Sequence, residues 1–145
     1  MTGKTIFWFR RDLRFEDNHG LYRALSSSNS VIPIFIFDKN IIEELEKDDP
    51  RITLIFDRLI YLNKKIKEFN SKILFFYGNP IDIFKELAKK YTIEKVVFNH
   101  DYEPYGVMRD RKITEFLKPN NIVVESYKDQ VIFEKDDSFE FLHNF

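Results

Sequence analysis

Charged side chains of the kind that bind anions or heterocyclic rings gather near the start of the chain. Residues 10–17 contain three arginines and two aspartates, directly after a short apolar run. Guanidinium groups form forked hydrogen bonds to phosphate or carboxylate, so Arg10 and Arg11 are expected to contact a ligand or another domain. For the other three charged residues two alternatives stay open, ligand contact or a structural role in fixing the loop and capping the next helix: Asp12, Arg14 and Asp17.

A second polar group lies at residues 99–110. Asp101 and Glu103 offer acceptors for the ring N–H groups of a heterocyclic ligand, and Gly106 allows a ligand or a backbone to approach closely. An alternative that can coexist with ligand contact is a pair between Glu103 and Arg109 across the first turn of a helix, worth about 0.5 kcal/mol. His100 either touches a ligand or is an ordinary loop residue.

Composition limits the chemistry of the chain. Its 145 residues form one domain by length, and its net charge of −1 gives the domain as a whole no electrostatic reason to bind DNA or acidic membranes. It has no cysteine, which excludes disulfides, thiolate metal sites and cysteine nucleophiles. Its histidines are scattered, so no metal site is expected. Its apolar runs are too short to span a bilayer and no signal peptide is recognised, which predicts a cytoplasmic protein.

Glycine-rich phosphate binding is not expected either. Only 4 glycines are present, and neither G-x-G-x-x-G nor the P-loop pattern occurs. A nucleotide-like ligand would have to be held by side chains and by amides at strand ends.

The elements that must position these residues follow from hydrophobic periodicity. Five apolar, β-rich runs alternate with amphipathic segments, and this alternation predicts an α/β fold: a Rossmann-like three-layer domain with a five-stranded parallel sheet in the order 3-2-1-4-5. The switch point then lies between the first and fourth strands, so the two polar groups converge on one crevice. The predicted strands cover residues 5–9, 31–37, 73–77, 95–99 and 122–127, and the predicted helices cover 18–28, 51–69, and segments beginning at Pro80 and Pro104.

Individual residues within these elements carry further expectations. The helix over 51–69 has one apolar stripe that includes Ile52, Ile55 and Phe56 and is expected to face the core. Asn79 is expected to cap the helix that follows it, and Val107 to point inward. Pro33 cannot donate to a neighbouring strand, so it is expected near the strand start or beside a gap in the ladder.

Residues 129–145 lack helical periodicity and carry excess acid. This pattern predicts a connector or a short hairpin. Its apolar side chains would need apolar partners: Phe139, Phe141, Leu142 and Phe145. Either this tail packs back, or the chain was cut from something longer.

Two motifs together resemble the photolyase/cryptochrome family. They are W-F-R-R-D-L-R-x-x-D-N at residues 8–18 and D-Y-E-P-Y-G-x-x-R-D at residues 101–110, with an apolar second strand that ends in Phe37 and Asp38 between them. The resemblance implies that residues 1–128 are the family's N-terminal α/β antenna domain and that 129–145 begin the linker to a helical FAD-binding domain that is missing here.

The resemblance also implies a ligand and a set of binding residues. In this family the N-terminal domain holds an antenna chromophore, which is a reduced folate, a deazaflavin or a flavin, although some members carry none. Asp101 and Glu103 match acceptor positions of the antenna pocket. Its walls are matched by four further residues: Arg10, Phe37, Asp38 and Gly106.

The expected function is therefore that of a photolyase antenna domain. It would support light-driven repair of pyrimidine dimers in the full-length protein, would not be catalytic alone, and would meet DNA only through that protein. The alternatives are a cryptochrome-type photoreceptor domain, a standalone nucleotide- or flavin-binding module, and an interaction domain that uses the Phe-rich tail.

Overall fold

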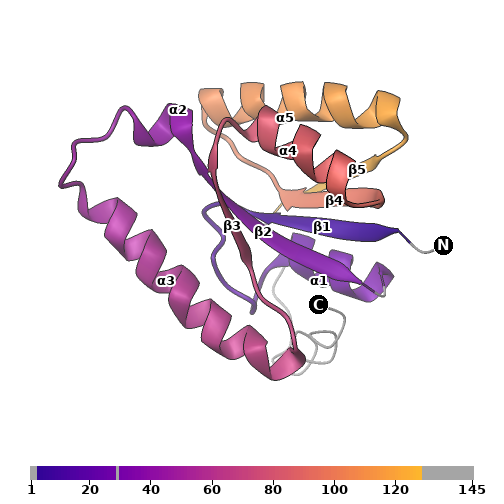
Figure 1. Cartoon of the computed structure of the whole chain (residues 1–145), viewed down its shortest axis with the longest axis horizontal. Coiled ribbons are helices and arrows are strands. Elements are labelled where there is room, and N and C mark those ends of the chain that lie inside the picture. Colours follow the sequence, from indigo (N-terminus) through magenta and orange to yellow (C-terminus); the bar gives the residue numbers. More distant parts are fainter. Residues whose placement is uncertain (1–2, 29, 129–145) are drawn as a thin grey trace.

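A five-stranded parallel sheet runs through the middle of the molecule (Figure 1). The computed structural model describes residues 3–28 and 30–128, so the predicted connector over 129–145 lies outside the described residues. The spatial order β3-β2-β1-β4-β5 confirms the predicted topology, and every neighbouring pair is parallel. The strands are β1 (Lys4–Phe9), β2 (Val31–Asp38), β3 (Leu74–Gly78), β4 (Ile93–Asn99) and β5 (Val123–Tyr127).

Helices cover both faces of this sheet. Their bounds are α1 (His19–Ser27), α2 (Lys39–Ile42), α3 (Pro50–Ile66), α4 (Pro80–Lys90) and α5 (Pro104–Leu117), with short 3₁₀ turns at Lys67–Phe69 and Lys118–Asn120. The four longer helices were predicted within a few residues, whereas the single-turn α2 was not. None of the described helices is long and apolar enough to cross a membrane.

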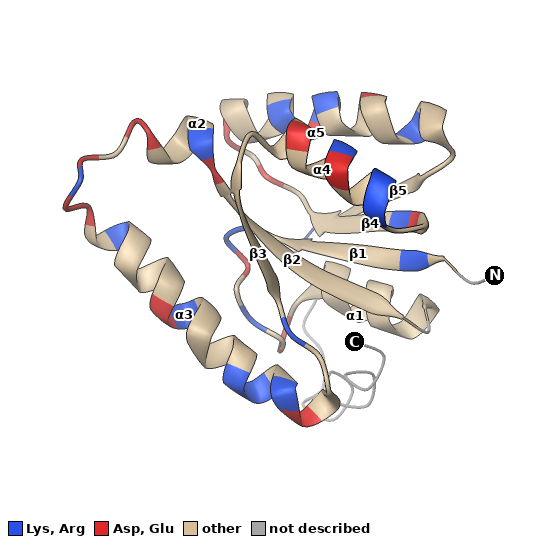
Figure 2. Ribbon diagram, viewed as in Figure 1, with Lys and Arg blue, Asp and Glu red and all other residues tan. Residues whose placement is uncertain are grey.

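Two apolar cores follow from the alternation of side chains along β1. Phe7 and Phe9 pack with residues of α1 and α3, while Ile6 and Trp8 pack with residues of α4 and α5. All four side chains are almost completely buried. Charged residues lie mainly on the helices and loops, and the strands carry few (Figure 2). The sheet is therefore packed on both faces by apolar side chains, and its polar residues gather at its carboxyl edge.

Pro33 lies inside β2, opposite Phe7 of β1. Pairing of β2 with β3 begins only at Ile34. The proline thus precedes the two-sided part of the strand, in agreement with the expected gap in the ladder.

The structure corrects three expectations about the helices. Only the second half of α3 is buried, and Phe56 is 46% exposed, so its apolar stripe does not face the core throughout. Val107 is 43% exposed rather than inward, because Gly106 and Arg109 take the inward positions of the first turns of α5. Asn79 stands at the N-cap position of α4, but its side chain makes no capping hydrogen bond.

Candidate functional site

A cleft of about 880 Å³ opens where β1, β2 and β4 end. It is bounded by the ends of these strands, by α2, by the first turns of α3 and by the β4–α5 loop. All of the binding residues named from the sequence line this one cleft: Arg10, Phe37, Asp38, Asp101, Glu103 and Gly106. Their convergence follows from topology, because parallel strands end at the same edge of a sheet.

The two walls of the cleft differ in chemistry. The outer wall is formed by the end of β2, by α2 and its following loop, and by the start of α3. It is mainly apolar, with Phe37, Ile41, Ile42, Leu45, Ile52 and Ile55, and it also carries Asn40, Glu44 and Arg51. The inner wall is charged: Arg10, Asp38, Asp101, Glu103 and Arg109. In the first half of α3, Ile52 and Ile55 are half-buried and line this cleft, and Ile55 also packs against the core.

Arg10 is held within the inner wall. Its side chain is 8% exposed, and its guanidinium carbon lies over the rings of Trp8 and Phe98, at 4.6 and 4.5 Å from their centroids. Its Nη1 donates to Asp110 Oδ1 at 2.6 Å, and its Nη2 donates to the carbonyl of Asn99. Burial lowers the pKa of the Arg10 guanidinium, and the carboxylate of Asp110 opposes this shift. Arg10 therefore lines the cleft with its charge already neutralised.

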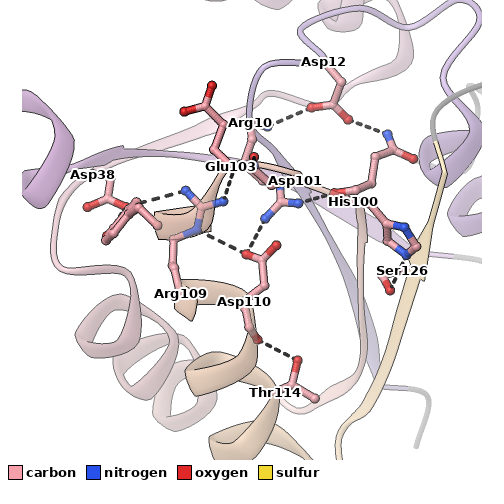
Figure 3. A network of polar contacts seen from close by, with 12 residues as sticks. Arg10, Asp12, Asp38, His100, Asp101, Glu103, Arg109, Asp110, Thr114 and Ser126 are labelled. Carbon is pink, nitrogen blue, oxygen red and sulfur yellow. Dashed lines mark hydrogen bonds and ion pairs between the residues drawn. The ribbon is translucent and has the colours of Figure 1, made fainter. Parts of the chain in front are cut away.

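Arg109 contacts three carboxylates of the inner wall and its surroundings (Figure 3). Its side chain is 7% exposed and donates to Asp101 Oδ2 at 3.1 Å and to Asp110 Oδ1 at 3.2 Å, with Asp38 Oδ2 at 3.7 Å. Its guanidinium carbon lies 4.9 Å from the ring centroid of Trp8. The pair expected between Arg109 and Glu103 is absent from these contacts, since Glu103 accepts from Arg11 instead.

The importance of Arg109 was missed at the sequence level, although a signal was present. The residue follows Gly106 by three positions and precedes Ile113 by four, which places it on the inward face of α5. A cation among the inward positions of a helix requires buried acceptors. The motif residues Asp101 and Asp110 supply two of them.

Gly106 is required by the close packing of Asp101. A methyl group at residue 106 would overlap the Asp101 carboxylate. That carboxylate is fixed because its Oδ1 accepts from the amide of Glu103 at 3.0 Å and its Oδ2 accepts from Arg109. The glycine thus allows an acidic group to lie against the first turn of α5.

Tyr105 and Asp38 join the two walls. The hydroxyl of Tyr105 donates to Asp38 Oδ2 at 2.7 Å, and Asp38 Oδ1 accepts from the amide of Asn40 at 2.9 Å and so caps α2. Burial and the hydrogen bond to Asp38 raise the pKa of Tyr105 to about 12. Tyr105 is a neutral donor at physiological pH, and no role was predicted for it from the sequence.

The remaining charged residues of the first motif fix the loop. Asp12 accepts from the amide of Arg10 at 2.8 Å and from Asn99 Nδ2 at 2.5 Å, and Asn99 Oδ1 accepts from the amide of Gly20 at 2.8 Å. Arg14 donates twice to the carbonyl of Asp17. Asn18 caps α1 by accepting from the amide of Leu21. These contacts support the structural alternative for Asp12, Arg14 and Asp17.

A smaller hollow of about 340 Å³ adjoins the cleft. It lies between the ends of β1 and β4, the crevice at which the two polar groups were predicted to meet. His100 lines it, with Nε2 3.0 Å from Ser126 Oγ. Arg11 and Glu103 line both cavities and form an ion pair at 3.2 Å, with side chains that are 74% and 62% exposed.

A doubly wound parallel sheet with a cleft outside its carboxyl edge defines a Rossmann-like ligand-binding domain. Comparison with known proteins gives a narrower class. The family model described as DNA photolyase matches residues 5–140. The chain belongs to the DNA photolyase family, and its fold is that of the family's N-terminal α/β domain.

Relatives of the chain include both repair enzymes and photoreceptors. A deoxyribodipyrimidine photo-lyase from Synechococcus sp. is 32% identical over 94% of the chain, and cryptochrome-2 from Gallus gallus is 28% identical over 94%. An archaeal photolyase from Sulfolobus tokodaii, crystallised with two FAD molecules, superposes with a TM-score of 0.76 and 30% identity over 92% of the chain. The chain spans 28%, 24% and 31% of these proteins, respectively.

Proposed function

We propose that this domain binds a light-harvesting chromophore in the large cleft. The observation that carries the proposal is the pairing of an apolar wall with a charged wall across one cavity of about 880 Å³. Ligand sites of this size bind organic molecules whose apolar area is buried and whose few polar groups are oriented by fixed side chains. A flat ring system that is apolar at one end and carries N–H and C=O groups at the other has this complementarity.

The residues of the two walls would then have separate tasks. Ile52, Ile55 and Phe37 would cover the apolar end of the ring system and exclude water from it. Glu103, whose side chain is more than half exposed and contacts Arg11 at 3.2 Å, would accept a ring N–H. Flavins, deazaflavins and reduced folates all present such a polar edge. The buried pairs of Arg10 and Arg109 would hold the inner wall in place.

The chromophore would absorb near-ultraviolet or blue light and pass the excitation energy to FAD held by another domain. The archaeal photolyase from Sulfolobus tokodaii supports this assignment, because its two FAD molecules are described as implying a novel light-harvesting cofactor. In this domain the site contributes binding, orientation and exclusion of water. It holds no group that would have to react.

For the whole protein we propose light-driven repair of pyrimidine dimers, with FAD and DNA bound outside the described residues. The photolyase relatives in sequence and in structure support this proposal. A signalling role is the second candidate, because cryptochrome-2 from Arabidopsis thaliana is 33% identical over 92% of the chain. Contact with an FAD-binding domain and a cytoplasmic location stay predictions.

The binding proposal is tested by titrating the chain into FAD, a deazaflavin and a reduced folate while recording the anisotropy of ligand fluorescence. Ile52→Asp, which places a charge in the apolar wall, is expected to abolish binding. Leu54→Asp is the matched control, because Leu54 lies on the same helix, is 65% exposed and does not line the cleft. Equal losses in the two variants, or no binding by a folded wild-type chain, would refute the proposal.

A further inference from the structure

The large cleft and the smaller hollow share four lining residues: Arg10, Arg11, Asp101 and Glu103. Arg10 and Asp101 are largely buried and are held by ion pairs with Asp110 and Arg109. Arg11, which follows β1, and Glu103, which precedes α5, instead contact each other at 3.2 Å and are largely exposed, so their pair adds little to stability and is easily exchanged for other partners. This pair is therefore the part of the shared boundary that a ligand can replace.

The chemistry of the smaller hollow differs from that of the cleft. Arg11 offers a guanidinium fork, the geometry that suits phosphate oxygens. Tyr102, which is 67% exposed, and His100 present two aromatic rings with centroids 6.2 Å apart. Exposed aromatic rings beside a cation are the features that bind a nucleotide through its base and its phosphate. The apolar outer wall of the cleft has no counterpart in this hollow.

The cations and anions of the hollow are not equally available. Arg10 is occupied by Asp110, and Asp101 is neutralised by Arg109. Asp12 accepts from Asn99 and from the amide of Arg10, and Arg14 donates to the carbonyl of Asp17. Arg11 and Glu103 are therefore the exposed ion pair of the hollow that can rearrange. A phosphate that takes Arg11 would release Glu103, whose carboxylate could then accept a ring N–H within the cleft. Binding at the two cavities would thus be coupled through one exchange of partners.

We propose that the smaller hollow holds the phosphate-bearing end of the chromophore, so that this domain selects a flavin nucleotide over the same ring system without phosphate. Arg11 binds the phosphate, and Tyr102 stacks on the base of a dinucleotide. This inference rests on the proposed function, since it assigns the second end of the same ligand. It adds the residues that would distinguish a flavin nucleotide from riboflavin, a distinction that the large cleft by itself does not supply.

The test compares riboflavin, FMN and FAD, which share one ring system and differ in the tail. Each is titrated with the chain, and its dissociation constant is measured by fluorescence at two ionic strengths. FMN is expected to bind about tenfold more tightly than riboflavin through one charge-assisted contact, and FAD about five- to tenfold more tightly than FMN through one stacked base. The preference for FMN over riboflavin should shrink as salt rises, because Arg11 is exposed.

Variants separate the two contacts. Arg11→Gln is expected to remove the preference for FMN over riboflavin while leaving riboflavin bound, and Tyr102→Ala to remove the preference for FAD over FMN. Arg111→Gln is the matched control, because Arg111 is an exposed arginine of α5 that lines neither cavity. It is expected to retain both preferences.

Three outcomes would overturn the inference. Equal affinity of the wild-type chain for the three flavins would leave the proposed function standing and remove the nucleotide subsite. Equal effects of Arg11→Gln and Arg111→Gln would show that general electrostatics, and not the hollow, attracts the phosphate. Failure of all three flavins to bind would overturn the inference, and failure of the deazaflavin and the folate as well would overturn the proposed function with it.

Discussion

Breaking the buried ion pair between Arg10 and Asp110 is expected to lower the stability of the domain. The two side chains are 8% and 14% exposed, and their contact is 2.6 Å long. Asp110→Asn keeps the shape of the side chain and removes its charge. The Arg10 guanidinium would then be buried against two aromatic rings, and its hydrogen bonds would go only to neutral acceptors.

The expected cost is about 3 kcal/mol of the free energy of unfolding. Breaking a buried pair by removing one partner costs roughly 3–5 kcal/mol, and the lower end applies here because the amide oxygen of asparagine can still accept a hydrogen bond. With a urea m-value of about 2 kcal/mol/M for a domain of this size, the midpoint should fall by about 1.5 M. Urea unfolding followed by far-ultraviolet circular dichroism measures this shift.

Two further variants show whether the cause is an unpaired charge. Glu86→Gln breaks an exposed pair with Lys89, at 3.8 Å and with both side chains more than three-quarters exposed, and is expected to change stability by less than about 0.5 kcal/mol. Replacing Arg10 as well, in the double variant Arg10→Met with Asp110→Asn, removes the unpaired charge and keeps a hydrogen-bond acceptor for Arg109, so it should cost less than Asp110→Asn alone. If Asp110→Asn shifts the urea midpoint no further than Glu86→Gln does, the Arg10–Asp110 pair does not stabilise the inner wall, and the reasoning is refuted.

Three other predictions follow from single contacts. Gly106→Ala should destabilise the chain by about 1–3 kcal/mol in thermal unfolding, because the added methyl overlaps the Asp101 carboxylate; the double variant with Asp101→Ala should recover part of this loss, and a neutral single variant would contradict the packing. Tyr105, with its pKa raised from 10.0 to about 12, contributes stability that is complete below pH 10 and is lost as the pH rises to about 12; unfolding at several pH values should show this loss, and Tyr105→Phe should abolish it. Asn99→Asp replaces a donor to Asp12 with a second carboxylate, so at pH 7 it should cost at least about 2 kcal/mol in urea unfolding, whereas a loss below about 0.5 kcal/mol, which is close to the noise of such measurements, would place Asp12 outside the network.

The sheet and the position of the cleft were predictable because they depend on patterns that are local in sequence. Continuous apolar runs such as residues 31–37 mark strands that are covered on both faces, and short connections between parallel strands restrict the order of the sheet. The polar residues that follow β1 and β4 then had to meet at one edge. The apolar stripe of α3 was equally visible, but periodicity shows only that a helix has an apolar face and not what covers it. Ile52 and Ile55, which belong to this apolar face, line the cleft.

The ion pairs were harder to predict, and Glu103 shows why. The expected pair with Arg109 assumed that both side chains lie on the flank of one helix. Glu103 instead occupies the N-cap position with an extended backbone, φ −75° and ψ 145°, so helical spacing does not apply to it. Its partner, Arg11, is 92 residues away in the sequence.

The order of elements along the chain is enough to tell which residues stand at the carboxyl edge of the sheet. Strand, loop and helix follow one another in the chain, and the parallel order brings their junctions together. Which of the charges at this edge already have a buried partner depends on packing between distant segments. Arg10 and Asp110 are 100 residues apart, and Asp12 and Asn99 are 87 apart. Burial makes an unpaired charge too costly to keep, so packing selects the partners, and residue type alone does not identify them.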